Sequence, residues 1–186
     1  MALTEIQAPS RSVLRYRPDY PLPPYRYVPG LHPHPVRDPA GHSYEGQPRH
    51  IHTAWDPAAW RSLDDWLLGV DQYNAFYFWE AHEAWERLWA AAPREATAAR
   101  VLQGLIQVTA ALLKIHLASL AGATALASAG TAKLAESAAS ARAVLGLDLA
   151  DTAASFTHYF RPLAERTLPP LDTSVPLLRL AEAGDA

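Results

Sequence analysis

Residues 100–114 read RVLQGLIQVTAALLK, and this stretch decides the fold of the chain. Drawn as a helix, it is apolar over more than half of its circumference, as expected of a helix that other helices surround. The remaining face carries two glutamines one turn apart, Gln103 and Gln107, beside the small residues Gly104 and Ala111. Small residues let a second helix approach closely, so we expect an all-α protein built around this segment.

The distribution of proline separates this helical region from the rest of the chain. Ten of the sixteen prolines lie between Pro9 and Pro48, whereas Pro93 is the only one between residues 58 and 161. Proline fixes φ and lacks an amide hydrogen, which excludes long helices and central strands from the first segment. Tyrosines and leucines interrupt the prolines there, so we expect this segment to pack on the helices.

The sequence therefore predicts one all-α domain, a bundle of about five helices with an irregular proline-rich N-terminal arm. We expect the arm over residues 1–54, the bundle over 55–164 and an extended C-terminal tail over 165–186. N-caps, glycines and prolines place the helices over residues 57–69, 72–91 or 74–91, 95–120, 123–144 and 148–160. No strand pattern competes with these helices.

Composition excludes several classes of function. The chain has 186 residues, no cysteine and a formal net charge of −3. Thiolate catalysis and cysteine-ligated metal centres are excluded, and no global positive field would draw the protein onto nucleic acid or anionic lipid. The first residues lack the pattern of a signal peptide, and no uninterrupted apolar run approaches bilayer length. We expect a cytoplasmic protein with neither nucleic-acid nor membrane partners.

Chemistry-bearing residues concentrate in residues 78–89, which read FWEAHEAWERLW. On a helix, His82 projects from within an apolar stripe, Glu86 lies one turn further at its edge, and Glu83 lies further round. Glu80 and Arg87 fall on the opposite face, where we expect them to meet solvent. Six tryptophans lie in or just before the first two helices, and we interpret them as core residues.

His82 and Glu86 have the spacing to chelate one metal ion or to share a proton. The pattern His-Glu-x-x-Glu shares its spacing with the zinc-protease pattern His-Glu-x-x-His, but Glu86 stands where the second imidazole would be. Gln103 and Gln107 have the same one-turn spacing and are predicted to face His82 and Glu86. A buried histidine held by a carboxylate for structural reasons is the alternative.

Two motifs together resemble a known family. EAHExxE at residues 80–86 with a following Trp89, then QGLIQ at residues 103–107, resembles the domain of unknown function family 309 over roughly residues 71–134. The resemblance implies a small helical bundle and a shared polar cluster between the second and third helices. That cluster would contain His82, Glu83, Glu86, Gln103 and Gln107.

Five histidines lie in the arm, and their role is open: His32, His34, His42, His50 and His52. Residues two apart in an extended segment point to the same side, so His32 with His34, and His50 with His52, could each hold a metal ion. Local hydrogen bonding is the alternative. Ser43 beside His42 is too close in the chain to form a triad by itself.

The leading hypothesis is a site for a divalent metal ion or small molecule, with metal-dependent hydrolysis as its chemistry. In that case His82 and Glu86 bind the metal, Glu83 is the general base, and Gln103 and Gln107 orient substrate or water. The alternative is a non-catalytic interaction module or homodimeric scaffold whose polar cluster fixes the register of the helices. The sequence does not decide whether the protein is an enzyme.

Overall fold

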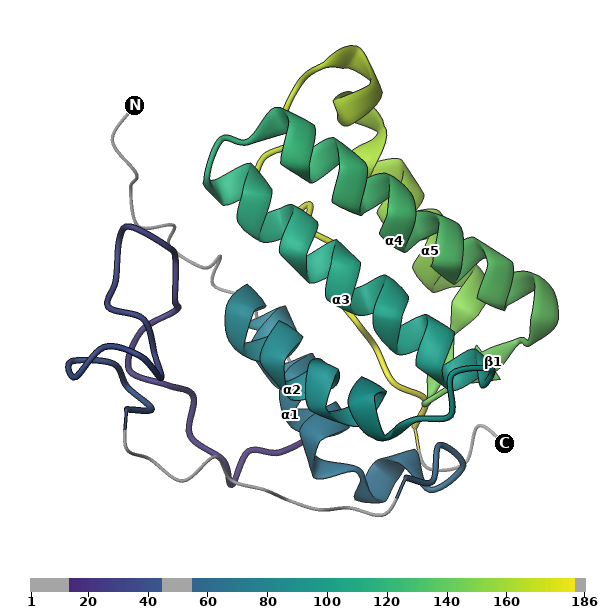
Figure 1. The fold of residues 1–186 in the computed structure, drawn as a ribbon. Coiled ribbons are helices and arrows are strands. Elements are labelled where there is room, and N and C mark those ends of the chain that lie inside the picture. The colour runs from purple at the N-terminus through teal and green to yellow at the C-terminus, as the bar shows by residue number, and fades with distance from the viewer. Residues whose placement is uncertain (1–13, 45–54, 183–186) are drawn as a thin grey trace.

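The computed structural model describes residues 14–44 and 55–182. Within them the chain forms five α-helices, two short 3₁₀ helices and one β-hairpin whose two strands have two residues each (Figure 1). The elements are η1 (Trp60–Ser62), α1 (Asp64–Asn74), α2 (Phe78–Ala91), α3 (Thr97–His116), α4 (Leu120–Ser140), β1 (Ala143–Val144), β2 (Leu147–Asp148), α5 (Leu149–Phe160) and η2 (Arg161–Glu165). The predicted all-α class is confirmed.

Helix α3 is the central element. It lies between α2 on one side and α4 on the other, while α1 packs on α2 and α5 packs on α4 (Figure 1). Among the described residues, α3 is the one helix long and apolar enough to cross a membrane by composition, and 67% of that stretch is buried in the protein. The same composition is expected of a helix enclosed by others.

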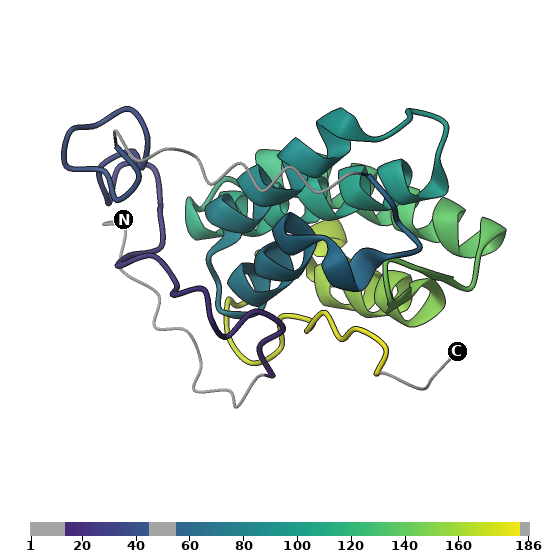
Figure 2. The same cartoon turned by 90° about the horizontal axis from the view of Figure 1, so that it is seen from below.

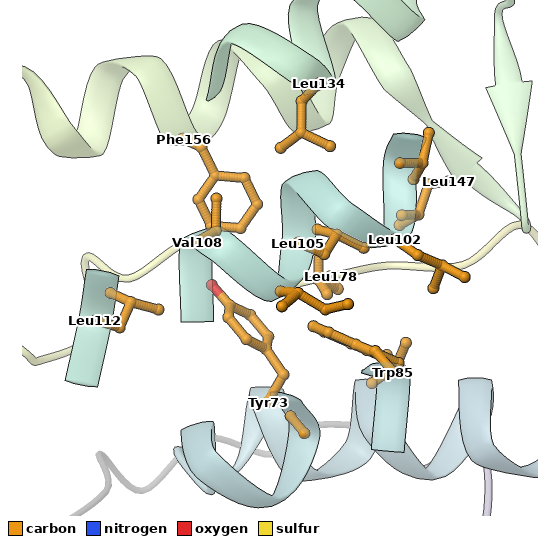
Figure 3. Close-up of a cluster of buried hydrophobic side chains, with 14 of the residues drawn as sticks. Tyr73, Trp85, Leu102, Leu105, Val108, Leu112, Leu134, Leu147, Phe156 and Leu178 are labelled. Atoms are coloured by element: carbon orange, nitrogen blue, oxygen red, sulfur yellow. The ribbon is translucent and has the colours of Figure 1, made fainter. Parts of the chain in front are cut away.

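The core joins side chains from all five helices and from the C-terminal tail. Tyr73 of α1 and Trp85 of α2 point toward the leucines of α3, and Phe156 of α5 approaches from the far side (Figure 3). The tail returns beside α1, along the lower edge of the molecule as drawn in Figure 2. There the amide of Asn74 donates to the Leu178 carbonyl and accepts from the Leu178 N–H, both at 2.9 Å. The tail thereby completes the core.

The predicted first helix was wrong at both ends. Asp56 accepts hydrogen bonds from the next turn, but only η1 follows, and extended backbone at Leu63 separates it from α1. Gly69, predicted to end the helix, lies inside α1. A Cβ at Gly69 would stand 2.2 Å from Nε1 of Trp85. Gly69 makes room for the indole ring of Trp85. From the sequence alone, a glycine with this packing role resembles one that ends a helix.

Other helix boundaries also moved. Helix α2 starts at Phe78, later than predicted, because Phe76 has a φ of 69° that interrupts helical geometry. Helix α3 is shorter than predicted, and α4 begins at Leu120, so Gly122 lies within it. The start of α5 is confirmed, since Asp148 caps it by accepting from Asp151 N–H at 3.0 Å.

Two glycines set the spacing of α3 and α4. A Cβ on Gly130 would lie 2.8 Å from the Gly104 carbonyl oxygen, and one on Gly104 would lie 3.1 Å from the Gly130 carbonyl oxygen. Both contacts are to backbone atoms, which cannot rotate away. The small face that the sequence indicated on residues 100–114 therefore meets the backbone of α4.

Gly130→Ala should destabilise the protein by about 1–3 kcal/mol through overpacking, despite a gain of about 1 kcal/mol in helix propensity. Urea unfolding followed by tryptophan fluorescence measures the change. Gly122→Ala is the matched control, since its Cβ would meet only the side chains of Ser119 and Lys114. Equal stabilities of the two variants would show that the helices are free to separate.

Two buried carboxylates hold the arm against the helices. Asp71 of α1 accepts the N–H groups of Tyr16 and Arg17, both at 2.8 Å. Glu80 of α2 accepts Tyr27 N–H at 2.9 Å and lies 3.2 Å from Nε2 of His42. These bonds connect positions more than 35 residues apart in the sequence.

Glu80 corrects an expectation, since it was predicted to face solvent and is only 4% exposed. The helical pattern shows that Glu80 lies away from the apolar stripe, but it does not show that the arm covers that face. Arg87 does reach the surface, where it pairs with the buried carboxylate of Asp65 at 2.7 Å.

Glu80→Ala should release the arm, because it leaves Tyr27 N–H and the His42 ring without their acceptor. The expected loss of stability is about 1–3 kcal/mol. Limited proteolysis should then cut within residues 17–44 faster than in the parent protein. The exposed Glu165→Ala is the control, and identical cleavage rates in the two variants would contradict this role of Glu80.

Candidate functional site

Three of the five predicted site residues come together on one side of α2. His82, Glu83 and Glu86 each offer a ligand atom, and these atoms lie within 4.8 Å of one another. The helix produces the group because Glu86 lies four residues after His82 and three after Glu83, and side chains at both spacings are neighbours on a helix surface. Among the described residues this is the one such group of histidine and acidic side chains.

The ring of His82 is held in a defined orientation between α2 and α3. Its Nδ1 lies 3.3 Å from the carbonyl oxygen of Ile106, and its Nε2 lies 3.1 Å from Oε1 of Glu86. A carbonyl oxygen only accepts, so Nδ1 carries a proton and donates it. Nε2 faces a second acceptor, the Glu86 carboxylate, so their contact needs a proton between them, and Nε2 can offer a lone pair to a metal ion only when the ion displaces that proton. The side chain is 24% exposed, which leaves it accessible from solvent.

Glu83 lies in an environment that disfavours its charge. Partial burial raises the pKa of its carboxyl, and the nearby Glu86 carboxylate raises the pKa further. His82, Arg87 and His34 act in the opposite direction without cancelling the effect. A cation placed at the cluster would remove this repulsion between carboxylates.

The two glutamines lie in different surroundings. Gln107 follows Ile106, the residue that accepts from His82, and its Oε1 is buried without a hydrogen-bond partner. Gln103 lines a surface groove with Trp89, which lies on the same face of α2 as His82. Neither glutamine forms a hydrogen bond with His82 or Glu86 in the described part of the chain, so their facing arrangement stays a prediction.

The arm contributes a residue that sequence reasoning did not assign to the site. The ring of His34 packs against Trp79 with centroids 5.4 Å apart, and its charge acts on Glu83. His32 instead stacks on Tyr25, with ring centroids 5.0 Å apart. The helical periodicity of residues 78–89 did not predict that Trp79 would contact a residue of the arm. His50 and His52 lie outside the described residues.

A second polar chain links the arm to α2. Ser43 Oγ lies 2.8 Å from Nδ1 of His42, and Nε2 of His42 lies 3.2 Å from Glu80. The order of groups resembles a catalytic triad, but the N–H groups of residues 42–44 are all bonded within the arm. None of these three is left to stabilise an oxyanion, so the chain serves to anchor the arm.

Comparison with protein families finds one match that covers the cluster. The family described as a domain of unknown function, DUF309, matches residues 66–126. The resemblance to this family that the two motifs predicted is confirmed over this segment, about a third of the chain. The match spans α1, α2, α3 and the start of α4, and it includes all five residues that the motifs singled out.

The DUF309 description names no activity. Comparisons with curated proteins and with solved structures found no match. The arm residues that hold Glu80 and approach Glu83 lie outside the matched segment.

Glu83→Gln should stabilise the metal-free protein at neutral pH. The raised pKa of Glu83 means that the folded state binds its proton more tightly than the unfolded state does, so ionisation of Glu83 weakens folding. The gain should vanish as pH falls below the ordinary glutamate pKa of 4.5, where Glu83 is protonated in both states. Thermal unfolding in a chelator at pH 4 and pH 7, with Glu165→Gln as control, measures this difference. The same shift at both pH values would contradict it.

Proposed function

We propose that His82, Glu83 and Glu86 bind a divalent metal ion that activates water for hydrolysis. The orientation of the His82 ring is the observation that carries the proposal. Histidines that ligate metals usually donate their second ring N–H to a carbonyl or carboxylate, which directs the other nitrogen at the metal. His82 has this arrangement, with Nδ1 on Ile106 and Nε2 toward Glu86.

The distances fit an ion with small side-chain adjustments. Ligand atoms about 2.1 Å from a tetrahedral metal lie about 3.4 Å apart. His82 Nε2 and Glu86 Oε1 are 3.1 Å apart, and the whole group falls within 4.8 Å. One imidazole with two carboxylates suits Zn²⁺, Mn²⁺ or Co²⁺, because nitrogen and oxygen donors are combined.

Three protein ligands from one helix leave part of the coordination sphere open. A water molecule bound there would have a lowered pKa and could act as a nucleophile. Glu83 has two roles available, since it can complete the ligand set or accept a proton from that water as general base. Its raised pKa is consistent with a group that takes up protons in this environment.

Metal titration of tag-free protein by calorimetry tests the proposal. We expect saturable binding of one Zn²⁺ or Mn²⁺ ion per chain, abolished by Glu86→Gln. On the predicted arrangement in which Gln107 faces the ligands, Gln107→Leu should weaken binding by about 10- to 100-fold. Glu165→Gln is the control. Unchanged affinity in Glu86→Gln would place the metal elsewhere.

Glu83→Gln distinguishes the two roles of that residue. Loss of metal binding identifies a ligand, whereas retained binding with lost hydrolysis identifies a general base. Absence of any stoichiometric metal in the parent protein would overturn the proposal. The cluster would then have the structural role of the alternative hypothesis, an interaction module or homodimeric scaffold.

A further inference from the structure

A groove beyond the C-terminal end of the His82, Glu83 and Glu86 cluster is lined by several positively charged side chains. It has a volume of about 550 Å³ and lies where the end of α2, the start of α3 and the middle of α4 meet. Its lining includes three cations, one carboxylate, an amide and an indole: Arg94, Arg100, Lys133, Glu136, Gln103 and Trp89. The volume is in the range of small-molecule sites.

The cations of the groove have no anionic partners. None of Arg94, Arg100 and Lys133 forms an ion pair with any carboxylate in the described part of the chain. This is unlike Arg87, which pairs with a carboxylate of the protein itself. Arg94 is positioned by Trp89, with its guanidinium carbon 4.0 Å from the centroid of the ring. The groove therefore presents three charges against the single carboxylate of Glu136.

The backbone adds to this positive field. Helix α3 begins at Thr97 and has no side-chain cap, so its first N–H groups lack side-chain acceptors. Ala99 of that first turn lines the groove, whereas Thr97 and Ala98 line a separate hollow and the Arg100 N–H already donates to the Ala96 carbonyl at 3.2 Å. A helix of 20 residues carries a partial positive charge at this end, which favours an anion beside it.

The groove continues the face of α2 that bears the metal cluster. At about 100° per residue, Trp89 lies within about 20° of His82 around the helix axis, and Glu86 within about 40°. Trp89 is about 5 Å from Glu86 along the axis, at about 1.5 Å per residue. One extended small molecule could thus reach both the cluster and the groove.

We propose that the groove binds a phosphate group of the substrate on which the metal cluster acts. The binding of phosphate by the groove stands by itself. The identification of the substrate as a phosphate-bearing small molecule rests on the proposed function. Arg100 offers the paired donors that suit phosphate oxygens, and Lys133 supplies a point charge from α4. Gln103 contributes its amide N–H₂, which gives this residue the ligand-orienting role that the sequence suggested.

Binding of inorganic phosphate to chelator-treated protein tests the groove without metal. At constant ionic strength, phosphate should shift the indole N–H resonance of Trp89 and the side-chain amide of Gln103 in a saturable manner. Arg100→Gln combined with Lys133→Gln should weaken this binding by about 10- to 100-fold. Arg161→Gln is a control of the same charge type on an exposed position outside the groove.

The outcomes separate this inference from the proposed function. Glu86→Gln should retain phosphate binding while losing metal, so the two sites can fail independently. No saturable shift with phosphate, or equal weakening by Arg161→Gln, would overturn the groove as a phosphate site. Equal shifts with acetate at the same ionic strength would also overturn it, because they would show an unselective positive surface.

Discussion

The contact between Trp85 and Gly69 sets the orientation of α2, and the candidate site depends on that orientation. Trp85 is fully buried, and its indole occupies the space that a Cβ on Gly69 would need. With Trp85 fixed between α1 and α3, its neighbours on the helix have no freedom to rotate. His82 and Glu86 consequently lie at the margin of the buried face, with side chains 24% and 48% exposed. A ligand-binding group needs this combination of fixed position and access to solvent.

Helix α3 provides the second fixed point. The carbonyl oxygen of Ile106 accepts from Nδ1 of His82 at 3.3 Å and from the Thr109 hydroxyl at 2.8 Å. The close packing of Gly104 on Gly130 holds α3 against α4, so this carbonyl has a defined place relative to α2. The orientation of one imidazole therefore depends on helix packing at a distance from it. The hydrogen bond from the His82 side chain to the backbone carbonyl of Ile106 thus links the motifs on the two helices.

The sequence predicted those features that depend on periodicity and spacing. The apolar circumference of residues 100–114 predicted a central helix, and the one-turn spacing of His82 and Glu86 predicted their contact. Features that depend on what covers a face could not be found in this way. Glu80 resembles a solvated residue because the pattern of α2 contains no information about the arm. Gly69 resembles a helix end because the sequence does not distinguish a glycine that makes room for a ring from a glycine that ends a helix.

The charges around α2 follow a consistent order about the helix axis. On one side the buried carboxylates of Glu80 and Asp71 bind the arm through its backbone N–H groups, so their charge is used within the protein. On the other side the cations of the groove have no partner of opposite sign among the described residues. The candidate cluster of His82, Glu83 and Glu86 lies between these two regions, with the arm closing one approach where His34 packs on Trp79. An anionic ligand would therefore meet attraction from the groove side.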